Sequence, residues 1–307
     1  MKYFINKISF FLIIIFSVWI FIECFYRFVP NNYTEKHKNI QNNYHKTEVL
    51  IFGNSHTFYG LNPEKFDQPA FNIANISQSI YFDKLLFDKH IDSFKNLKYV
   101  VLNLEYTSLS QKDNTQEDTW RKYFYREQMD LDVSIIPLYD IRQYSLAMSR
   151  SFKNSIITIQ QYFEKGTIIE CDELGWGHKY TYDKRRQNLD ELAVRVTEKH
   201  EDNSMDFKIN TQRIKSIIKK CKEKNINVIL VTMPVHKSYS EKVNPKKVRA
   251  IHSVAKNLAL ENSNSFYINL FYSDKFSDED FYDPDHLNDR GAKKCSILLN
   301  EFIEQND

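Results

Sequence analysis

The sequence predicts an α/β fold, a three-layer, doubly wound domain in which helices cover both faces of a roughly five-stranded parallel sheet. Short apolar runs alternate along the chain with longer segments of helical spacing. The runs are rich in Val, Ile and Leu with few polar interruptions, as is typical of strands buried on both faces. Strands that alternate with helices in this way indicate parallel pairing.

Five segments are predicted as the strands of this sheet. They are residues 49–52, 70–73, 99–104, 226–231 and 266–270. Helical spacing of apolar residues predicts helices over 80–94 and 210–225. Two further helices are predicted to begin at Asn244-Pro245 and at a cap formed by Asp289.

The N-terminus has the pattern of a transmembrane helix within residues 1–29. Lys2 and Lys7 precede the uncharged run Ile8–Ile22, and the flanking charges place the N-terminus inside and the remaining chain outside. A single-pass signal anchor with an extracytoplasmic (periplasmic or cell-surface) domain is therefore expected. A cleaved signal peptide and a buried core helix are the alternatives, although no small-x-small cleavage site follows the run. Lipidation at Cys24 is disfavoured because the carboxylate of Glu23 precedes it.

After the anchor, residues 30–46 are rich in Asn, Lys and His and are interpreted as a tether. Residues 47–307 form the predicted domain. The interval from about 113 to 206 breaks the strand–helix alternation and is predicted as a mainly helical insertion over the carboxyl edge of the sheet, where ligands bind in such folds. Within it, Gly175-Trp176-Gly177-His178 suits either a sugar-stacking platform or a hydrophobic anchor.

Composition excludes several classes of function. The 307 residues carry a formal net charge of +2, so charge gives no reason to expect a nucleic-acid partner. No metal-ligand constellation and no glycine-rich phosphate loop is evident, and no metal or cofactor is predicted. Of the four cysteines, Cys221 and Cys295 lie on apolar faces of predicted helices and are expected as buried thiols, with a disulfide left open.

Two motifs carry the chemistry. Ser55 lies in Gly53-Asn54-Ser55, directly after the first strand, where a turn can expose its hydroxyl. Asp283 and His286 form a D-x-x-H spacing just before the last helix, so that one loop can supply a base and its orienting carboxylate. Each motif alone is more typical of a turn or a helix cap than of catalysis. Because the two loops lie on the same edge of a doubly wound sheet, we expect the motifs to meet.

This joint arrangement resembles the SGNH/GDSL hydrolase superfamily, whose sheet is flavodoxin-like. Gly53–Ser55 corresponds to the family's G-D-S block, and Phe281–Ala292 is similar to its final block. More narrowly, Leu50–Gly60, Asn72–Ser79 and Phe281–Ala292 resemble a branch of envelope-anchored members related to O-acylation or deacylation of cell-surface polysaccharides. The resemblance covers both ends of the domain and not its middle.

The resemblance implies a catalytic triad. Carried over by position, Ser55 is the nucleophile, His286 the general base and Asp283 its orienting partner. Asp285 is the rival for the last role, but it is adjacent to His286 and neighbouring side chains usually diverge.

The same comparison implies an oxyanion hole with departures from the family pattern. The expected donors are the Ser55 N–H, Ser77 at the position of the second-block Gly, and Thr107 at the position of the third-block Asn. Asn103 lies earlier on the strand, where alternation could direct it elsewhere. We take Asn54, His56, Gln78 and His236 as substrate-binding candidates.

The sequence thus predicts a serine esterase or O-acyltransferase acting on acyl esters, foremost acetyl esters, of an extracytoplasmic glycan, with a membrane-bound acyl-donor partner as an option. Because the third-block Asn is missing, a catalytically silent glycan-binding or assembly component is the alternative. Membrane proximity leaves a lipid or lipoprotein ester hydrolase as a further alternative.

Overall fold

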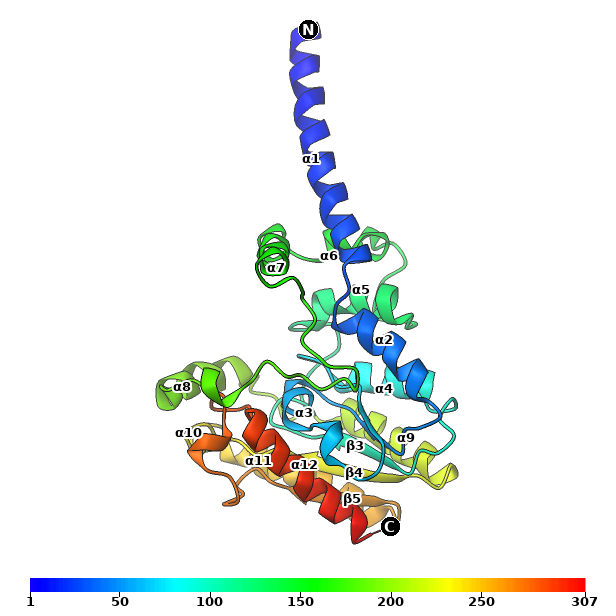
Figure 1. The fold of residues 1–307 in the computed structure, drawn as a ribbon, viewed down its shortest axis with the longest axis vertical. Helices are drawn as coiled ribbons and strands as arrows, with labels where there is room; N and C mark the ends of the chain where they lie inside the picture. Colours follow the sequence, from blue (N-terminus) through cyan, green and yellow to red (C-terminus); the bar gives the residue numbers. More distant parts are fainter. Residues whose placement is uncertain (307) are drawn as a thin grey trace.

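A computed structural model describes residues 1–306 and contains a five-stranded, all-parallel sheet with strand order β2-β1-β3-β4-β5 (Figure 1). The strands are β1 Val49–Ile51, β2 Ala70–Asn72, β3 Tyr99–Asn103, β4 Asn227–Thr232 and β5 Ser265–Asn269. This confirms the predicted α/β class and places all five predicted strands within two residues at either end.

Helices precede, connect and follow the strands. The α-helices are α1 Lys2–Phe28, α2 Asn32–Asn43, α3 Ser55–Gly60, α4 Ile80–His90, α5 Asp118–Met129, α6 Leu146–Ser149, α7 Phe152–Lys165, α8 Leu189–His200, α9 Lys208–Glu223, α10 Lys237–Ser240, α11 Pro245–Glu261 and α12 Asp289–Glu304. Short 3₁₀ turns are η1 Pro63–Lys65, η2 Ile141–Tyr144, η3 Tyr182–Lys184 and η4 Asp278–Asp280. The stretch expected as an insertion thus holds α5 to α8.

Strand alternation divides the core between the two faces of the sheet. On one face Leu50, Val100 and Leu230 join the apolar sides of α4, α9 and α11. On the other face Ile51 and Val101 pack with the apolar side of α12. The free cysteines are Cys24, Cys171, Cys221 and Cys295. Cys221 and Cys295 are buried thiols, as expected.

Two local predictions need correction. The last helix is capped by Asn288, whose side chain accepts from the N–H groups of Arg290 and Gly291, and Asp289 is instead the first helical residue. Residues 32–43, expected within a tether, form helix α2, whose Tyr33 and Ile40 are buried in the main core. This segment therefore packs against the domain.

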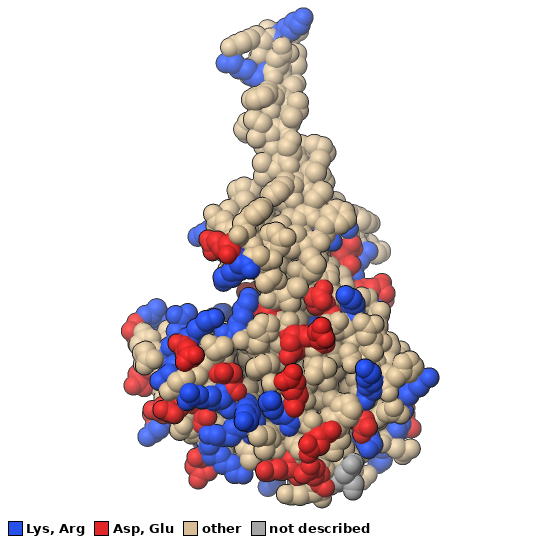
Figure 2. Space-filling view, in the orientation of Figure 1, with Lys and Arg blue, Asp and Glu red and all other residues tan. Residues whose placement is uncertain are grey.

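Helix α1 projects from the domain, and Figure 2 shows its shaft without charged side chains between the lysines at its tip and the domain. It is the one helix among residues 1–306 that is long and apolar enough to cross a membrane. Its last turns are held by the domain: Trp19 Nε1 donates to Ser145 Oγ at 3.2 Å, and Glu23 accepts from the Ala147 N–H at 2.9 Å.

Candidate active site

The turn between β1 and α3 presents Ser55. Gly53 has a φ of +124°, and a Cβ there would come within 2.6 Å of Asn103 Cβ, so only glycine fits. Asn54 caps α3 by accepting from the His56 N–H at 3.1 Å. Ser55 is therefore the first residue of the helix, where a backbone N–H has no intrahelical acceptor. The local sequence places the hydroxyl and this N–H together at the edge of the sheet.

The loop between η4 and α12 brings His286 to this serine. His286 Nε2 lies 2.8 Å from Ser55 Oγ, and Nδ1 lies 3.0 and 3.1 Å from the two carboxylate oxygens of Asp283. Asp283 Oδ1 also accepts from the backbone N–H of His286 at 2.9 Å, which fixes the loop. The structure thus joins the three residues in the order that a serine triad requires.

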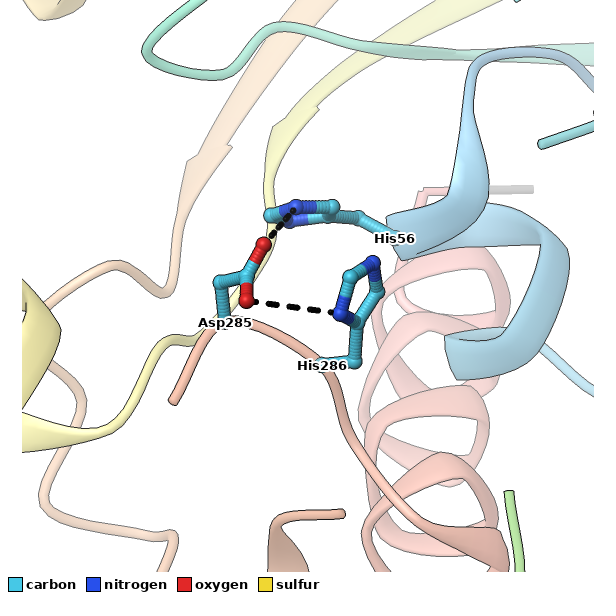
Figure 3. A group of neighbouring side chains, drawn as sticks. All are labelled: His56, Asp285 and His286. Atoms are coloured by element: carbon cyan, nitrogen blue, oxygen red, sulfur yellow. Dashed lines mark ion pairs between the residues drawn. The ribbon is translucent and has the colours of Figure 1, made fainter. Parts of the chain in front are cut away.

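Asp285 also reaches the His286 ring, against the expectation that adjacent side chains diverge. Its Oδ1 lies 3.4 Å from His286 Nδ1, and its Oδ2 lies 3.3 Å from His56 Nε2 (Figure 3). His56 Nδ1 in turn lies 2.6 Å from Glu105 Oε2. Asp283 remains the closer partner of His286, while Asp285 connects the two imidazoles.

Charges in this cluster shift the pKa values of both histidines. Burial alone would lower the pKa of His56, but Glu105 and Asp285 raise it to about 9. Burial also opposes the charged form of His286, yet Asp283 and Asp285 raise its pKa well above the usual value. Burial would raise the pKa of Asp285, but His286 and His56 hold it well below its usual value. The cluster therefore alternates acidic and cationic groups.

His56, Asp285 and His286 also place one possible metal-ligand atom each within 4.8 Å of one another. All four imidazole nitrogens, however, already face protein partners: Glu105, Asp285, Asp283 and Ser55. A metal would have to displace the serine or a carboxylate. The donor set does not fit a resident ion, and the expected absence of a metal stays a prediction.

The loop after β2 carries Ser77 and Gln78 beside the nucleophile. Ser77 has a φ of +54°, the left-handed conformation that favours glycine, which is the residue expected at this position in the resembled family. Gln78 is engaged at both ends of its amide: Nε2 donates to Asp83 at 2.7 Å, and Oε1 accepts from Tyr125. Asp83 also accepts from the Gly53 N–H at 3.1 Å. Asp83 therefore joins the turn before Ser55 to the loop that carries Ser77.

The region after β3 differs from an amide-bearing oxyanion hole. Asn103 Nδ2 donates to Asn54 Oδ1 at 3.0 Å, and Asn54 Nδ2 donates to Glu105. The Thr107 hydroxyl lies 3.4 Å from Glu105 Oε1. All four side chains are thus linked through hydrogen bonds, and Glu105 brings a buried carboxylate into the lining of the cavity beside Thr107, the expected donor.

Ser55 and His286 line a cavity of about 430 Å³. Asn54, His56, Ser77, Gln78 and Thr107 also line it, whereas His236 does not and instead contacts Asp278 at 3.1 Å. Sequence reasoning missed further lining residues. They are Ile76, Glu105, Gln111, Gln116, Glu117, Tyr180, Lys199 and His200, and Asp285, the predicted rival of Asp283, lines the cavity as well.

Aromatic residues of the 169–187 segment support the catalytic loop. The Tyr180 ring stacks between the rings of Tyr59 and Tyr282, with distances between ring centroids of 3.8 and 3.9 Å. Trp176 Nε1 donates to the Tyr59 carbonyl at 2.8 Å, and Trp176 does not line the cavity. Of the two interpretations of residues 175–178, the structure favours the anchor.

No protein-family model matches the sequence. No curated protein matches it either. Similar solved structures include a provisionally named platelet activating factor of Streptococcus pneumonia, at 10% identity and a TM-score of 0.44 over 96% of this chain and 99% of that one. They also include a provisionally named acylhydrolase of Bacteroides fragilis NCTC 9343, at 14% identity and a TM-score of 0.43 over 89% and 95%. At these values the fold assignment rests on the sheet topology, and the site rests on its own geometry.

Proposed function

We propose that the protein is a serine-dependent ester hydrolase or O-acyltransferase of the SGNH/GDSL type. The observation that carries this proposal is the continuous contact from Ser55 Oγ through the His286 ring to Asp283, with heavy-atom distances of 2.8 and 3.0 Å. A serine hydroxyl is a weak nucleophile at neutral pH, and an imidazole at hydrogen-bond distance activates it.

In the proposed reaction His286 Nε2 accepts the Ser55 proton as Oγ attacks the acyl carbon. The tetrahedral oxyanion faces the N–H groups of Ser55 and Ser77. As the intermediate collapses, His286 returns the proton to the departing alcohol and the acyl group stays on Ser55. Water then completes hydrolysis, whereas a sugar hydroxyl completes transfer. Asp283 keeps the ring oriented in both halves.

The cavity favours short acyl groups on polar carriers. Its volume is about 430 Å³, and Ile76 and Tyr180 are the only residues of its lining without a charged, amide, aliphatic hydroxyl or imidazole side chain. Such a lining suits an acetyl ester of a glycan better than a fatty acyl chain, which would need an apolar channel. Together with the apolar α1, this supports the proposal of an extracytoplasmic glycan substrate and of an acyl donor held at the membrane.

One observation favours a second candidate, a catalytically silent glycan-binding component. Glu105 is 6% exposed and lines the cavity, and the amide donor that the resembled family has after this strand is missing, with Thr107 at its position. A fixed negative charge there would oppose an oxyanion. Loss of one such donor typically costs about 10²–10³ in rate. The proposed enzyme is accordingly slow. A catalytically silent component would be the case in which the rate falls to that of the uncatalysed reaction.

The test is hydrolysis of p-nitrophenyl acetate by the full chain in a neutral detergent. We expect Ser55→Ala and His286→Ala each to lower kcat/KM by about 10³-fold. Ser253→Ala and His45→Ala, exposed positions outside the site, are the matched controls and should retain activity. Equal rates in all five proteins would reject the hydrolase and leave a strict transferase or the silent component.

Substrate class is tested separately with natural esters. We expect release of acetate from O-acetylated polysaccharide, and transfer of acetyl to a glycan acceptor if the enzyme is a transferase. Release of fatty acid from phospholipid bilayers, without release of acetate from the polysaccharide, would instead support a lipid hydrolase.

A further inference from the structure

A second cavity, of about 160 Å³, lies where α1 ends. Its walls come from the last turn of α1, the start of α2, α5, α7 and the loop after β2. The lining residues used below are Asn75, Trp120, Arg121, Arg150 and Glu170. Ile76 lines both this cavity and the catalytic one. The cavity is therefore a neighbour of the active site on the side of the apolar helix.

Three buried hydrogen-bond donors of this cavity have no acceptor among residues 1–306. They are Asn75 Nδ2, Arg121 Nε and Arg150 Nε. Asn75 is 2% exposed, and its Oδ1 is already used by the Ile76 N–H at 2.9 Å. Buried donors are normally paired, and here three belong to residues that line one cavity. This coincidence indicates a ligand that supplies acceptors.

The two arginines also gather positive charge. The Arg121 and Arg150 guanidinium groups lie 4.5 and 4.4 Å from the centre of the Trp120 ring. Within residues 1–306, Arg121 has one carboxylate in ion-pair range, Glu117 at 3.7 Å, whereas Arg150 has no ion pair and donates to the Thr158 hydroxyl at 3.0 Å. Two cations held on one aromatic ring repel each other, and an anion bound close to both would reduce that repulsion.

The carboxylate that lines the cavity does not supply this anion. Glu170 Oε1 lies 2.7 Å from Lys179 Nζ, and its Oε2 accepts from the Tyr59 hydroxyl at 2.6 Å. Helix α2, which has 12 residues, begins at the cavity with Asn32, so that the positive end of its dipole adds to the field of the arginines.

We propose that this cavity binds an oxyanion, a phosphate group, beside Arg121, Arg150 and Asn75. Planar guanidinium groups match the paired oxygens of such anions. Asn75 belongs to the loop that carries Ser77, so the bound anion holds the oxyanion-hole loop from behind. The anion is either free in solution or the headgroup of a lipid that lies beside α1. Binding of the anion does not require the proposed acyl chemistry, whereas its effect on the oxyanion-hole loop rests on that proposal.

The test uses the full chain with Ser55→Ala, so that binding is measured whether or not the protein is an enzyme. Isothermal titration in a neutral detergent would use inorganic phosphate in one arm. The second arm would use mixed micelles of dioctanoyl phosphatidic acid, with dioctanoylglycerol as the phosphate-free lipid. We expect Arg150→Gln to weaken binding at least tenfold and Arg150→Lys to weaken it less. Arg142→Gln is the matched control, because Arg142 pairs with Asp140 outside the cavity.

Saturable binding of inorganic phosphate with this dependence on Arg150 would establish a site for free oxyanions. Binding only of phosphatidic acid micelles, with the same dependence, would establish a lipid headgroup as the source. If neither probe binds, or if Arg150→Gln and Arg150→Lys both bind as the parent does, the proposal is overturned. Equal melting temperatures of the variants would show that the comparison is between folded proteins.

Discussion

Among individual residues, His56 has surroundings that bear directly on the protonation of the catalytic base. It lies between two buried carboxylates, Glu105 at 2.6 Å and Asp285 at 3.3 Å, and its ring centre is 4.7 Å from that of His286. With a pKa raised to about 9, His56 is a cation at neutral pH. It therefore offsets part of the negative charge that Asp285 and Asp283 direct at His286.

This arrangement predicts the pH dependence of catalysis. His286 accepts a proton only when it is neutral, and its pKa is raised. Activity should therefore fall as pH falls through a value above the ordinary histidine pKa. His56→Gln removes a nearby positive charge, so the pKa of His286 should rise further and the acidic limb of kcat/KM should move up by about one pH unit. The measurement is a pH–rate profile beside the control His45→Gln, and a limb that stays or moves down would contradict this account.

Sequence reasoning found the residues with a recognisable spacing and missed those joined only by folding. Ser55 and the Asp283–His286 pair follow a strand and precede a helix, positions that a pattern can reveal. Glu105 and Asp285 reach His56 from distant parts of the chain, and no periodicity marks such a contact. Ser77 was placed by resemblance, but its positive φ could not be predicted because a serine rarely adopts it.

Among the secondary-structure elements, the loop after β2 depends on α4 for its position. Asp83 on α4 is 2% exposed and accepts from both the Gly53 N–H and the Gln78 amide. The Asp83 carboxylate thus fixes the distance between the turn that carries Ser55 and the loop that carries Ser77. Burial raises the pKa of Asp83 to about 7, so the charged form of this carboxyl group is costly at that place.

Replacing this carboxylate should therefore loosen the site. Asp83→Ala leaves the Gly53 N–H and the Gln78 amide without an acceptor, and we expect the free energy of unfolding to fall by about 2 kcal/mol. Urea unfolding of the full chain measures the change. Asp88→Ala, on the same helix but with its side chain half-exposed beside Lys84, should cost far less. Equal losses for the two variants would show that Asp83 does not hold the loop.

Helix α2 illustrates why one element escaped prediction. Tyr33, Lys36 and Ile40 follow helical spacing on its buried side, but a lysine in that row conceals the apolar pattern. Burial of Lys36 is tolerated because its Nζ donates to the carbonyls of Asn72 at 2.7 Å and Gly175 at 2.6 Å. Burial also lowers the pKa of this lysine to about 8. The sheet strands, in contrast, are continuous apolar runs and were predictable.

At the scale of the whole molecule, contacts of the last turns of α1 determine how this apolar helix is oriented relative to the domain. Beyond the contacts of Trp19 and Glu23, the Tyr26 hydroxyl donates to Ser155 Oγ at 3.1 Å and the Tyr26 carbonyl accepts from Gln128 at 2.7 Å. These contacts reach α5, α6 and α7. The domain is therefore held in a fixed orientation to α1.

Removing one contact should release α6. Glu23→Ala takes the acceptor away from the Ala147 N–H and the Ser145 hydroxyl. We expect faster amide hydrogen exchange over residues 145–149, with little change in the sheet. Glu164→Ala, an exposed position on α7, is the control. Unchanged exchange in residues 145–149 would mean that the helix is not held by Glu23.

The proposal that Ser55 is an activated nucleophile is best tested by covalent labelling of the full chain with a fluorophosphonate. The geometry predicts one adduct on the peptide that contains Ser55, its absence in Ser55→Ala and a strongly reduced rate in His286→Ala. No adduct, or an equal adduct in Ser55→Ala, would contradict the assignment of Ser55 and His286 as a catalytic pair.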